Sequence, residues 1–257
     1  MMKRVESAMP RYVQSPNLPE TAVCHALIAE SACALLQDSL AAQGVRAVAA
    51  PKTLSLPYRV NDHADMNCRH LGGKELLVFQ DAVFSPRLNE AGLHPVSAAS
   101  KGGDRYPRDA ALNALLISGF AFHKTDITDQ RLRQALEERN YAWVHVNQGY
   151  TACSAAIVDA YSLITADDGI AAAAEQIGFD VLKITSGFVD LPGYDYGFLG
   201  GACGKLGPDR LAFTGRIDQH PDCARILDFL AGHGVAPVYL TERPCFDCGG
   251  IIPVTQL

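Results

Sequence analysis

Five short apolar runs recur along the chain, and each of them ends in a small or acidic residue. A brief apolar run between turn-forming residues is typical of a buried strand. The runs lie at residues 26–30, 76–81, 115–119, 163–167 and 211–215. Their centres are 39 to 50 residues apart, which is too uneven for a solenoid whose units must stack evenly. The pattern therefore predicts five repeated units of another kind.

A helix is predicted after each run, clearly in four units and only weakly in the second, around residues 86–90. Helical spacing of apolar residues defines the expected buried faces. These are Leu35, Leu36 and Leu40; Leu132, Ala135 and Leu136, after a Thr128 cap; Ile170, Ala173, Ala174 and Ile177; and Cys223, Ile226, Leu227 and Leu230. Each helix is expected to end at a residue that tolerates left-handed backbone, namely Gly44, Gly92, Asn140, Gly178 and Gly234. A second strand then follows, at 45–49, 95–98, 142–146, 181–184 and 237–240.

A further strand precedes most of the runs, at residues 65–68, 153–157 and 200–205. The first run has no such partner before it, but the chain ends in an apolar strand, 248–254, that no helix follows. We expect this C-terminal strand to complete the first unit and close a ring, which removes exposed sheet edges. The alternative is an open α/β sandwich with five helices. Either arrangement is one α/β domain over residues 21–257, preceded by a polar surface arm at residues 1–20.

Four segments of the chain resemble an uncharacterised bacterial family assigned to the pentein fold. They are residues 60–66, 146–150, 191–201 and 249–253, and the likeness spans most of residues 22–257. The resemblance implies an α/β propeller of five ββαβ units around a central pit. Members of this fold include the guanidino-group modifying enzymes, such as arginine deiminase, agmatine deiminase, dimethylarginine hydrolase and glycine amidinotransferase. The likeness to those enzymes is architectural, and a shared fold does not transfer function.

Polar residues alternate along residues 60–67, which predicts a strand with one wholly polar face. That face carries Asn61, His63, Asp65 and Asn67. If the ring closes, this face lines the central pit; the alternative is a solvent-exposed edge. His63 and Asp65 are then a candidate acid–base pair, because a neighbouring carboxylate raises the pKa of an imidazole and fixes its tautomer. The guanidino-modifying enzymes also carry a His-x-Asp element, but later in the chain.

The segment 186–201 contains five glycines and two tyrosines around Asp195. Glycines allow close approach of the backbone, and Tyr194 and Tyr196 together with this carboxylate suit a planar cation such as a guanidinium. The alternative is a structural loop whose tyrosines cover helix ends. Gln148 and Asp247 occupy equivalent strand entrances in other units and are weaker candidates for substrate binding.

Three cysteines are candidate nucleophiles: Cys153, Cys203 and Cys248. In the guanidino-modifying enzymes the catalytic cysteine follows a glycine-rich turn near the C-terminus. Here Cys248 instead precedes Gly249 and Gly250, and two isoleucines follow them. Each cysteine has the alternative role of a small buried hydrophobic residue. A reactive thiol needs a nearby cation or imidazole, which only His63 is placed to supply.

Cys245 and Cys248 have the CxxC spacing of redox and zinc sites. A zinc site usually needs a second ligand pair, for which Cys68 and His70 are the sole candidates. The strand–helix context of a thioredoxin motif is absent. We therefore predict neither a metal nor a cofactor.

The 257 residues carry a net charge of −6, with 48% hydrophobic and 19% charged residues. This composition is ordinary for a globular chain. Without a basic cluster, nucleic acid is not an expected partner. No apolar stretch approaches a membrane span, and residues 1–20 lack the apolar segment of a secretion signal. Together with eight cysteines expected as thiols, these features predict a cytoplasmic protein.

Two functions remain open from the sequence. The first is an enzyme that acts on a small guanidino, amidine or amide compound in the pit, with His63 as general base, Asp65 and Asp195 orienting the substrate, and a cysteine attacking a trigonal carbon. The second is a small-molecule binding or sensing protein that kept the pit and lost the nucleophile. A third, binding protein and RNA as the ribosome anti-association factor of this fold does, is disfavoured by the acidic charge.

Overall fold

The computed structural model describes residues 9–84 and 86–257, and its strands form separate small sheets. Five sheets share one strand order, in which the first two strands are antiparallel and the last two are parallel. The first of these sheets contains β1 (Arg11–Tyr12), β18 (Ile252–Gln256), β2 (Val23–Ile28) and β3 (Arg46–Ala49). The second contains β5 (Cys68–His70), β6 (Glu75–Val78) and β8 (His94–Ser97).

The other three sheets repeat this order. They are β9 (Leu115–Ile117), β10 (Phe120–His123) and β11 (Ala142–His145); β12 (Ala155–Ile157), β13 (Ser162–Thr165) and β14 (Asp180–Lys183); and β15 (Cys203–Gly207), β16 (Arg210–Phe213) and β17 (Ala236–Tyr239). A two-stranded ribbon, β4 (Lys52–Thr53) with β7 (Ala82–Val83), lies outside this series.

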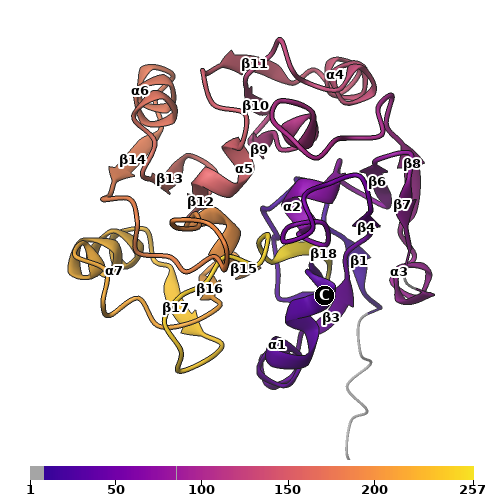
Figure 1. The fold of residues 1–257 in the computed structure, drawn as a ribbon. Helices are drawn as coiled ribbons and strands as arrows, with labels where there is room; N and C mark the ends of the chain where they lie inside the picture. Colours follow the sequence, from indigo (N-terminus) through magenta and orange to yellow (C-terminus); the bar gives the residue numbers. More distant parts are fainter. Residues whose placement is uncertain (1–8, 85) are drawn as a thin grey trace, which may run out of the picture.

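A helix connects the two parallel strands of each sheet, because a parallel pair requires a crossover. These helices are α1 (Glu30–Ala42), α3 (Pro86–Glu90), α4 (Gln130–Glu137), α6 (Asp168–Gln176) and α7 (Cys223–Gly232). Figure 1 shows them around the periphery of the molecule, with the shorter α2 and α5 nearer its middle. All five predicted stop residues have positive φ, from +58° at Asn140 to +91° at Gly178. The periodic pattern and the stop residues therefore located the five helices.

Two details of the helices differ from the sequence prediction. Asp129, not Thr128, caps α4 and accepts hydrogen bonds from the Arg131 and Leu132 amides. The Thr128 hydroxyl is held instead by Nδ1 of His123 at 2.6 Å. Ile177, predicted on the buried face of the fourth helix, is 39% exposed because α6 ends one residue before it.

The last strand joins the first sheet, as the sequence predicted. β18 pairs antiparallel with β2, and Ile252 lies opposite Leu27. Figure 1 shows the yellow end of the chain beside its indigo beginning. The expected arm covers residues 1–20, of which residues 1–8 lie outside the described part of the chain. Within the rest of the arm, β1 pairs with β18 and forms the edge of the first sheet next to it. The sequence did not predict this added strand; the boundary at residue 21 stays a prediction.

A helical turn precedes the first strand in four of the sheets, and in the second, fourth and fifth sheets the sequence predicted strand at these residues. The turns are α2 (Ala64–Asn67), η1 (Arg108–Ala110), α5 (Thr151–Ser154) and η2 (Gly200–Ala202). The predicted strand at residues 60–67 is therefore wrong: its alternation ends in α2, whose last residue, Asn67, donates from Nδ2 to the His63 carbonyl at 2.7 Å. His63 is the N-cap residue of α2, with extended backbone, and Asp65 lies in the first turn of this helix, so strand alternation does not place the two on one face.

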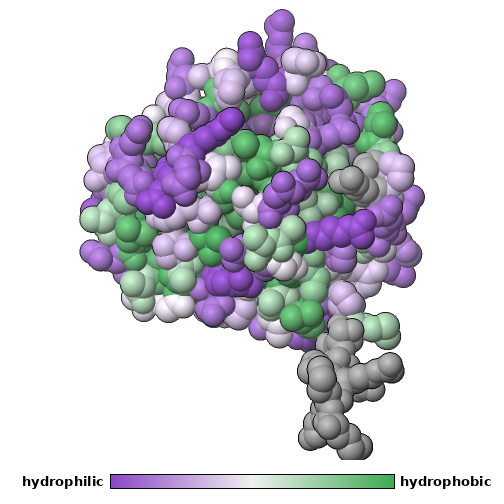
Figure 2. All heavy atoms as spheres, turned by 90° about the horizontal axis from the view of Figure 1, so that it is seen from below, coloured by the Kyte–Doolittle hydropathy of each residue, from purple (hydrophilic) through white to green (hydrophobic). Residues whose placement is uncertain are grey.

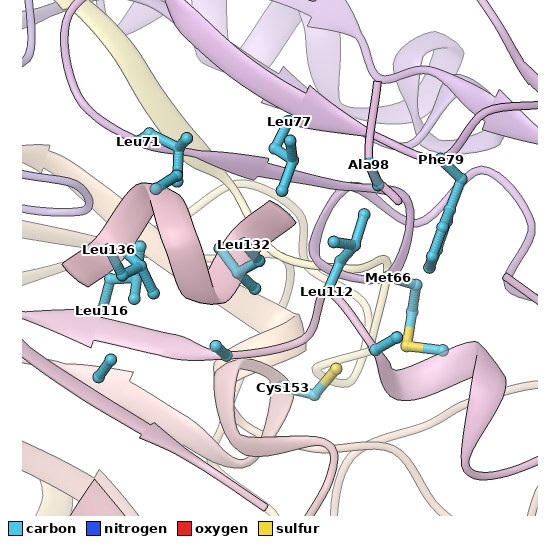
Figure 3. Packing of buried hydrophobic residues seen from close by; sticks show 14 of the residues in the cluster. Met66, Leu71, Leu77, Phe79, Ala98, Leu112, Leu116, Leu132, Leu136 and Cys153 are labelled. Atoms are coloured by element: carbon cyan, nitrogen blue, oxygen red, sulfur yellow. The ribbon is translucent and has the colours of Figure 1, made fainter. Parts of the chain in front are cut away.

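The apolar core consists of several clusters, each between neighbouring sheets and their helices. Figure 3 shows one of them, in which Leu132 and Leu136 of α4 belong to the same cluster as Leu77, Met66 and Cys153. On the face in Figure 2, hydrophobic and hydrophilic residues are intermixed in small patches. Within residues 9–84 and 86–257, no helix has both the length and the apolar character needed to cross a membrane.

A histidine joins two neighbouring units through two carboxylates. His233, at the C-terminal end of α7, lies 2.8 Å from Oδ2 of Asp159 by Nδ1 and 3.0 Å from Oδ2 of Asp180 by Nε2. His233→Ala should lower the free energy of unfolding by about 0.5–1 kcal/mol at pH 7, because the ring loses its contacts with two partly exposed carboxylates. Urea unfolding measures this loss. His94→Ala, at an exposed position, is the matched control, and an equal effect of the two variants contradicts the prediction.

Candidate active site

A cavity of about 330 Å³ opens among the helical turns and the glycine-rich loop. Its lining combines three carboxylates with three tyrosine rings: Asp109, Asp195, Asp247, Tyr150, Tyr194 and Tyr196. His63, Met66 and Cys153 complete its polar and sulfur-bearing wall. Among the described residues that line it there is no lysine or arginine. Such a lining is suited to a small organic cation, which carboxylates attract and aromatic faces stabilise.

His63 and Asp247 form a buried pair at the floor of this cavity. Nδ1 of His63 lies 3.6 Å from Oδ1 of Asp247, and the two residues are 6% and 5% exposed. The Asp247 carboxylate also accepts backbone hydrogen bonds, from Phe198 to Oδ2 and from Gly249 to Oδ1, each at 2.9 Å. Burial raises the pKa of Asp247 above its ordinary value, and the charge of Asp65 adds to this, against the opposing effect of His63. The expected partner of His63 was Asp65, which the structure does not bear out.

Glycines pack directly against this pair. A Cβ at Gly201 would overlap the Asp247 carboxylate, and one at Gly197 would overlap its Cβ. A Cβ at Gly249, which has a φ of +77°, would overlap Cβ of His63. The glycines noted in the sequence therefore allow the close backbone approach that holds His63 against Asp247.

Asp109 was not among the residues predicted from the sequence. It lies in η1, is 5% exposed, and accepts a hydrogen bond from the Tyr150 hydroxyl at 2.8 Å. Burial raises its pKa, although the Tyr150 bond opposes that shift. Asp109 lies in an irregular linker with no periodic pattern.

Cys153 is the one predicted cysteine that lines the large cavity. It lies in α5, and its Sγ accepts a hydrogen bond from Nδ2 of Asn113 at 2.8 Å. Burial raises the pKa of this thiol well above its ordinary value, and the charges of Asp65 and Asp247 raise it further. The thiol is therefore protonated while the cavity is empty of positive charge.

Cys203 and Cys248 lie elsewhere. Cys203 borders a separate small cavity of about 50 Å³, and Cys248 packs in an apolar cluster with Leu206 and Ile251. Burial raises the pKa of both thiols well above the ordinary value. Of the three candidate nucleophiles, therefore, only Cys153 lines the cavity that His63 also lines.

Asp65 also faces the small cavity rather than the large one. It is 4% exposed, and neither carboxylate oxygen has a hydrogen-bond partner among the described residues. Arg69 and Lys205 border the same space, and Nη2 of Arg69 donates to the Asp65 carbonyl at 2.8 Å. Although Asp65 does not line their cavity, it helps to raise the pKa of both Cys153 and Asp247.

The remaining predicted binding residues lie partly outside the large cavity. Asn61 and Asn67 are buried in the turn and helix around His63 and do not line it. Gln148 lines an adjoining cavity and donates from Nε2 to Oδ2 of Asp167 at 3.0 Å. Tyr194, Asp195 and Tyr196 line the large cavity, as predicted for a ligand-binding loop, and are exposed at its rim.

The CxxC pair shows no metal-binding arrangement. Cys245 and Cys248 are buried thiols, and Cys68 and His70 lie in another sheet, on β5. Over residues 9–84 and 86–257, no group of three or more His, Cys, Asp or Glu side chains is positioned to hold a metal ion.

Among the solved structures that match this chain are two amidinotransferases and a deiminase. SxtG, an amidinotransferase of the saxitoxin biosynthetic pathway from Microseira wollei, matches with a TM-score of 0.54 and 10% identity, over 94% of this chain and 97% of that one. Agmatine deiminase from C. jejuni matches with a TM-score of 0.51 and 8% identity, over 98% of each chain. The inosamine-phosphate amidinotransferase StrB1 from Streptomyces griseus matches with a TM-score of 0.51 and 10% identity, over 90% and 92%.

At identities of 8–10% the likeness establishes the fold, which is a mixed α/β fold of the amidinotransferase and deiminase kind. A shared fold does not establish the reaction, which has to be argued from the residues of the site. No curated protein sequence matches the chain significantly. One family model does match, over residues 27–252, and the chain therefore belongs to the family of unknown function DUF6873.

Proposed function

We propose that the large cavity binds a small organic cation with a planar guanidino or amidine group. The observation that carries this proposal is the cavity lining, in which Asp109, Asp195 and Asp247 face tyrosine rings without an accompanying lysine or arginine among the described residues. A planar cation gains from carboxylate hydrogen bonds at its edge and from aromatic contact with its face. A neutral or anionic ligand gains neither and must approach buried carboxylates.

We further propose that Cys153 attacks the trigonal carbon of this ligand. The Cys153 proton passes to His63, an Sγ–C bond forms, and the tetrahedral intermediate collapses as its C–N bond breaks. The departing amine takes the proton from His63, and the carbon remains on sulfur as a thiouronium. Water then releases it, or a second amine accepts it. Burial, together with the charges of Asp65 and Asp247, raises the pKa of the Cys153 thiol in the empty site. A cation bound beside Asp247 offsets the charge of that carboxylate and so lowers the thiol pKa relative to the empty site.

The fold supports this role through its arrangement. We infer that the five sheets, which share one strand order, form a closed five-unit propeller within a single domain at residues 21–257. The pairing of β18 with β2 and the convergence of α2, η1 and α5 on one cavity support this inference. The polar segments that are scattered along the sequence meet at the axis of such a ring.

A non-catalytic binding protein is the second candidate, and one observation favours it. The positions after Gly249 and Gly250 are Ile251, Ile252 and Pro253, all buried, and they carry no nucleophile. Under this alternative the cavity and its cation preference are retained, and Cys153 serves only as a small side chain beside Met66.

A pair of alkylating agents separates these possibilities. 2-Chloroacetamidine carries the cationic amidine, and 2-chloroacetamide is its neutral counterpart. For each agent, the rate of Cys153 labelling is divided by its rate with free cysteine. We expect this ratio to be at least about tenfold higher for the amidine than for the amide, because the carboxylates concentrate the cation beside the thiol. Peptide mass spectrometry identifies the labelled residue, Cys153→Ser abolishes labelling, and Cys248→Ser leaves it intact.

Equal labelling by the two agents contradicts the cation site. Selective labelling without release of ammonia or amine from a panel of guanidines contradicts turnover and favours the binding protein. Product release by the wild type that is lost in Cys153→Ser, while this variant still binds guanidines, supports the enzyme.

A further inference from the structure

A second cavity adjoins the candidate active site. It measures about 220 Å³ and shares two residues of its wall, Tyr196 and Phe198, with the large cavity. Their rings stand edge to face with centroids 6.3 Å apart. The two cavities therefore adjoin each other at the rings of Tyr196 and Phe198.

The charge of this compartment comes from one carboxylate. Asp167 is half-buried in its wall, and its Oδ2 accepts from Gln148 while its Oδ1 accepts from the Ile170 amide. A carboxylate has about four lone-pair sites, so two bonds leave capacity for another donor. As in the large cavity, none of the described lining residues is a lysine or arginine.

The histidine in this wall does not supply positive charge. Nε2 of His220 lies 3.1 Å from the Thr185 carbonyl and its Nδ1 accepts from the Asp222 amide at 3.0 Å, so the ring is used as a neutral tautomer. Burial lowers the pKa of His220, against the opposing charge of Asp222. The N-terminus of α6 would attract an anion, but Asp167 already caps it and repels one.

We infer that the ligand is extended, with a guanidino or amidine head in the large cavity and a terminal amine, not a carboxylate, in the second cavity beside Asp167. The inference rests on the proposed cation site, and it narrows the substrate class to guanidines whose distal end is also cationic. Amino-acid guanidines such as arginine would bring a carboxylate close to Asp167. The described residues that line the second cavity include no lysine or arginine to pair with that carboxylate, so these guanidines are disfavoured.

Calorimetric titration with four ligands tests this inference. Methylguanidine reports the head group alone, butylguanidine adds an apolar tail, agmatine adds a terminal amine at similar length, and arginine adds a carboxylate. We expect agmatine to bind about tenfold or more tighter than butylguanidine, which corresponds to one charge-assisted hydrogen bond. Arginine should bind more weakly than agmatine by a similar factor.

Asp167→Asn is the informative variant, because asparagine is also a good helix N-cap and preserves α6. In this variant, agmatine and butylguanidine should bind with affinities that differ by less than about twofold, since the terminal amine loses its ionic partner. Ala166→Phe, which fills the second cavity, should remove the same advantage by exclusion.

If the wild-type protein binds methylguanidine but binds agmatine no more tightly than butylguanidine, the inference is wrong, while the proposed site for the guanidino head group is retained. An agmatine preference that survives both variants also overturns it. Failure of methylguanidine and every longer guanidine to bind refutes the proposed function itself.

Discussion

Asp247→Asn should weaken binding of a guanidinium ligand by about 30- to 100-fold at pH 7.5, because the buried carboxylate at the cavity floor contributes a charge-assisted hydrogen bond. Both carboxylate oxygens also accept backbone hydrogen bonds. An asparagine satisfies only one of these donors, so His63 is also displaced from its position beside residue 247. Calorimetry with agmatine measures the loss, and a thermal unfolding scan confirms that the variant is folded.

Asp195→Asn is the control for that experiment. Asp195 lines the same cavity but is exposed, so its loss should cost less than about fivefold in affinity. A variant ranking in which Asp195→Asn costs more than Asp247→Asn would place the cation at the rim and contradict the proposed site.

The pH dependence of binding follows from the direction of the shifts. The pKa values of Asp247 and Asp109 are both raised, chiefly by burial, so each carboxyl group loses its proton at a higher pH than an ordinary aspartate does. Affinity for a cation should therefore increase from pH 5 to pH 8 in the wild type and increase less in Asp247→Asn. The stability of the empty protein has the opposite sign: a carboxyl group with a raised folded-state pKa favours the folded state at low pH, and this contribution is lost as the pH rises.

Gly201→Ala should destabilise the protein by about 1–3 kcal/mol and weaken cation binding about tenfold or more, because the added methyl group overlaps the Asp247 carboxylate and overpacks the floor. Gly201 lies in η2 and packs directly against the Asp247 carboxylate. Urea unfolding measures the first effect and calorimetry the second.

Gly232→Ala is the matched substitution. Gly232 also lies in a helix, α7, and a Cβ there meets nothing within 4 Å. It should leave binding unchanged and stabilise the helix by about 0.5–1 kcal/mol. If both substitutions have the same effect on binding, close packing of Gly201 against Asp247 is not what positions the carboxylate.

The candidate site was only partly predictable from the sequence. The glycine-rich loop with Tyr194 and Tyr196 was found because glycines and aromatic residues cluster there in sequence. The pairing of His63 was mispredicted, because alternation over residues 60–67 imitates a strand while the backbone forms a helical turn. Asp109 was missed because a linker without periodicity gives no indication of which side chain becomes buried.

The amino-acid sequence by itself determined four of the repeated units, the ends of the five helices and the pairing of the last strand with the first apolar run. These features depend on local periodicity and on backbone preferences at single residues such as Asn140. In the third unit the apolar run at residues 115–119 forms the edge strand β9, and the strand that leads into α4 is β10, which was not predicted. Only the tertiary structure decided which polar side chains meet. His63, Asp109, Cys153 and Asp247 come from different units, and their distances depend on how the units pack, which no local pattern encodes.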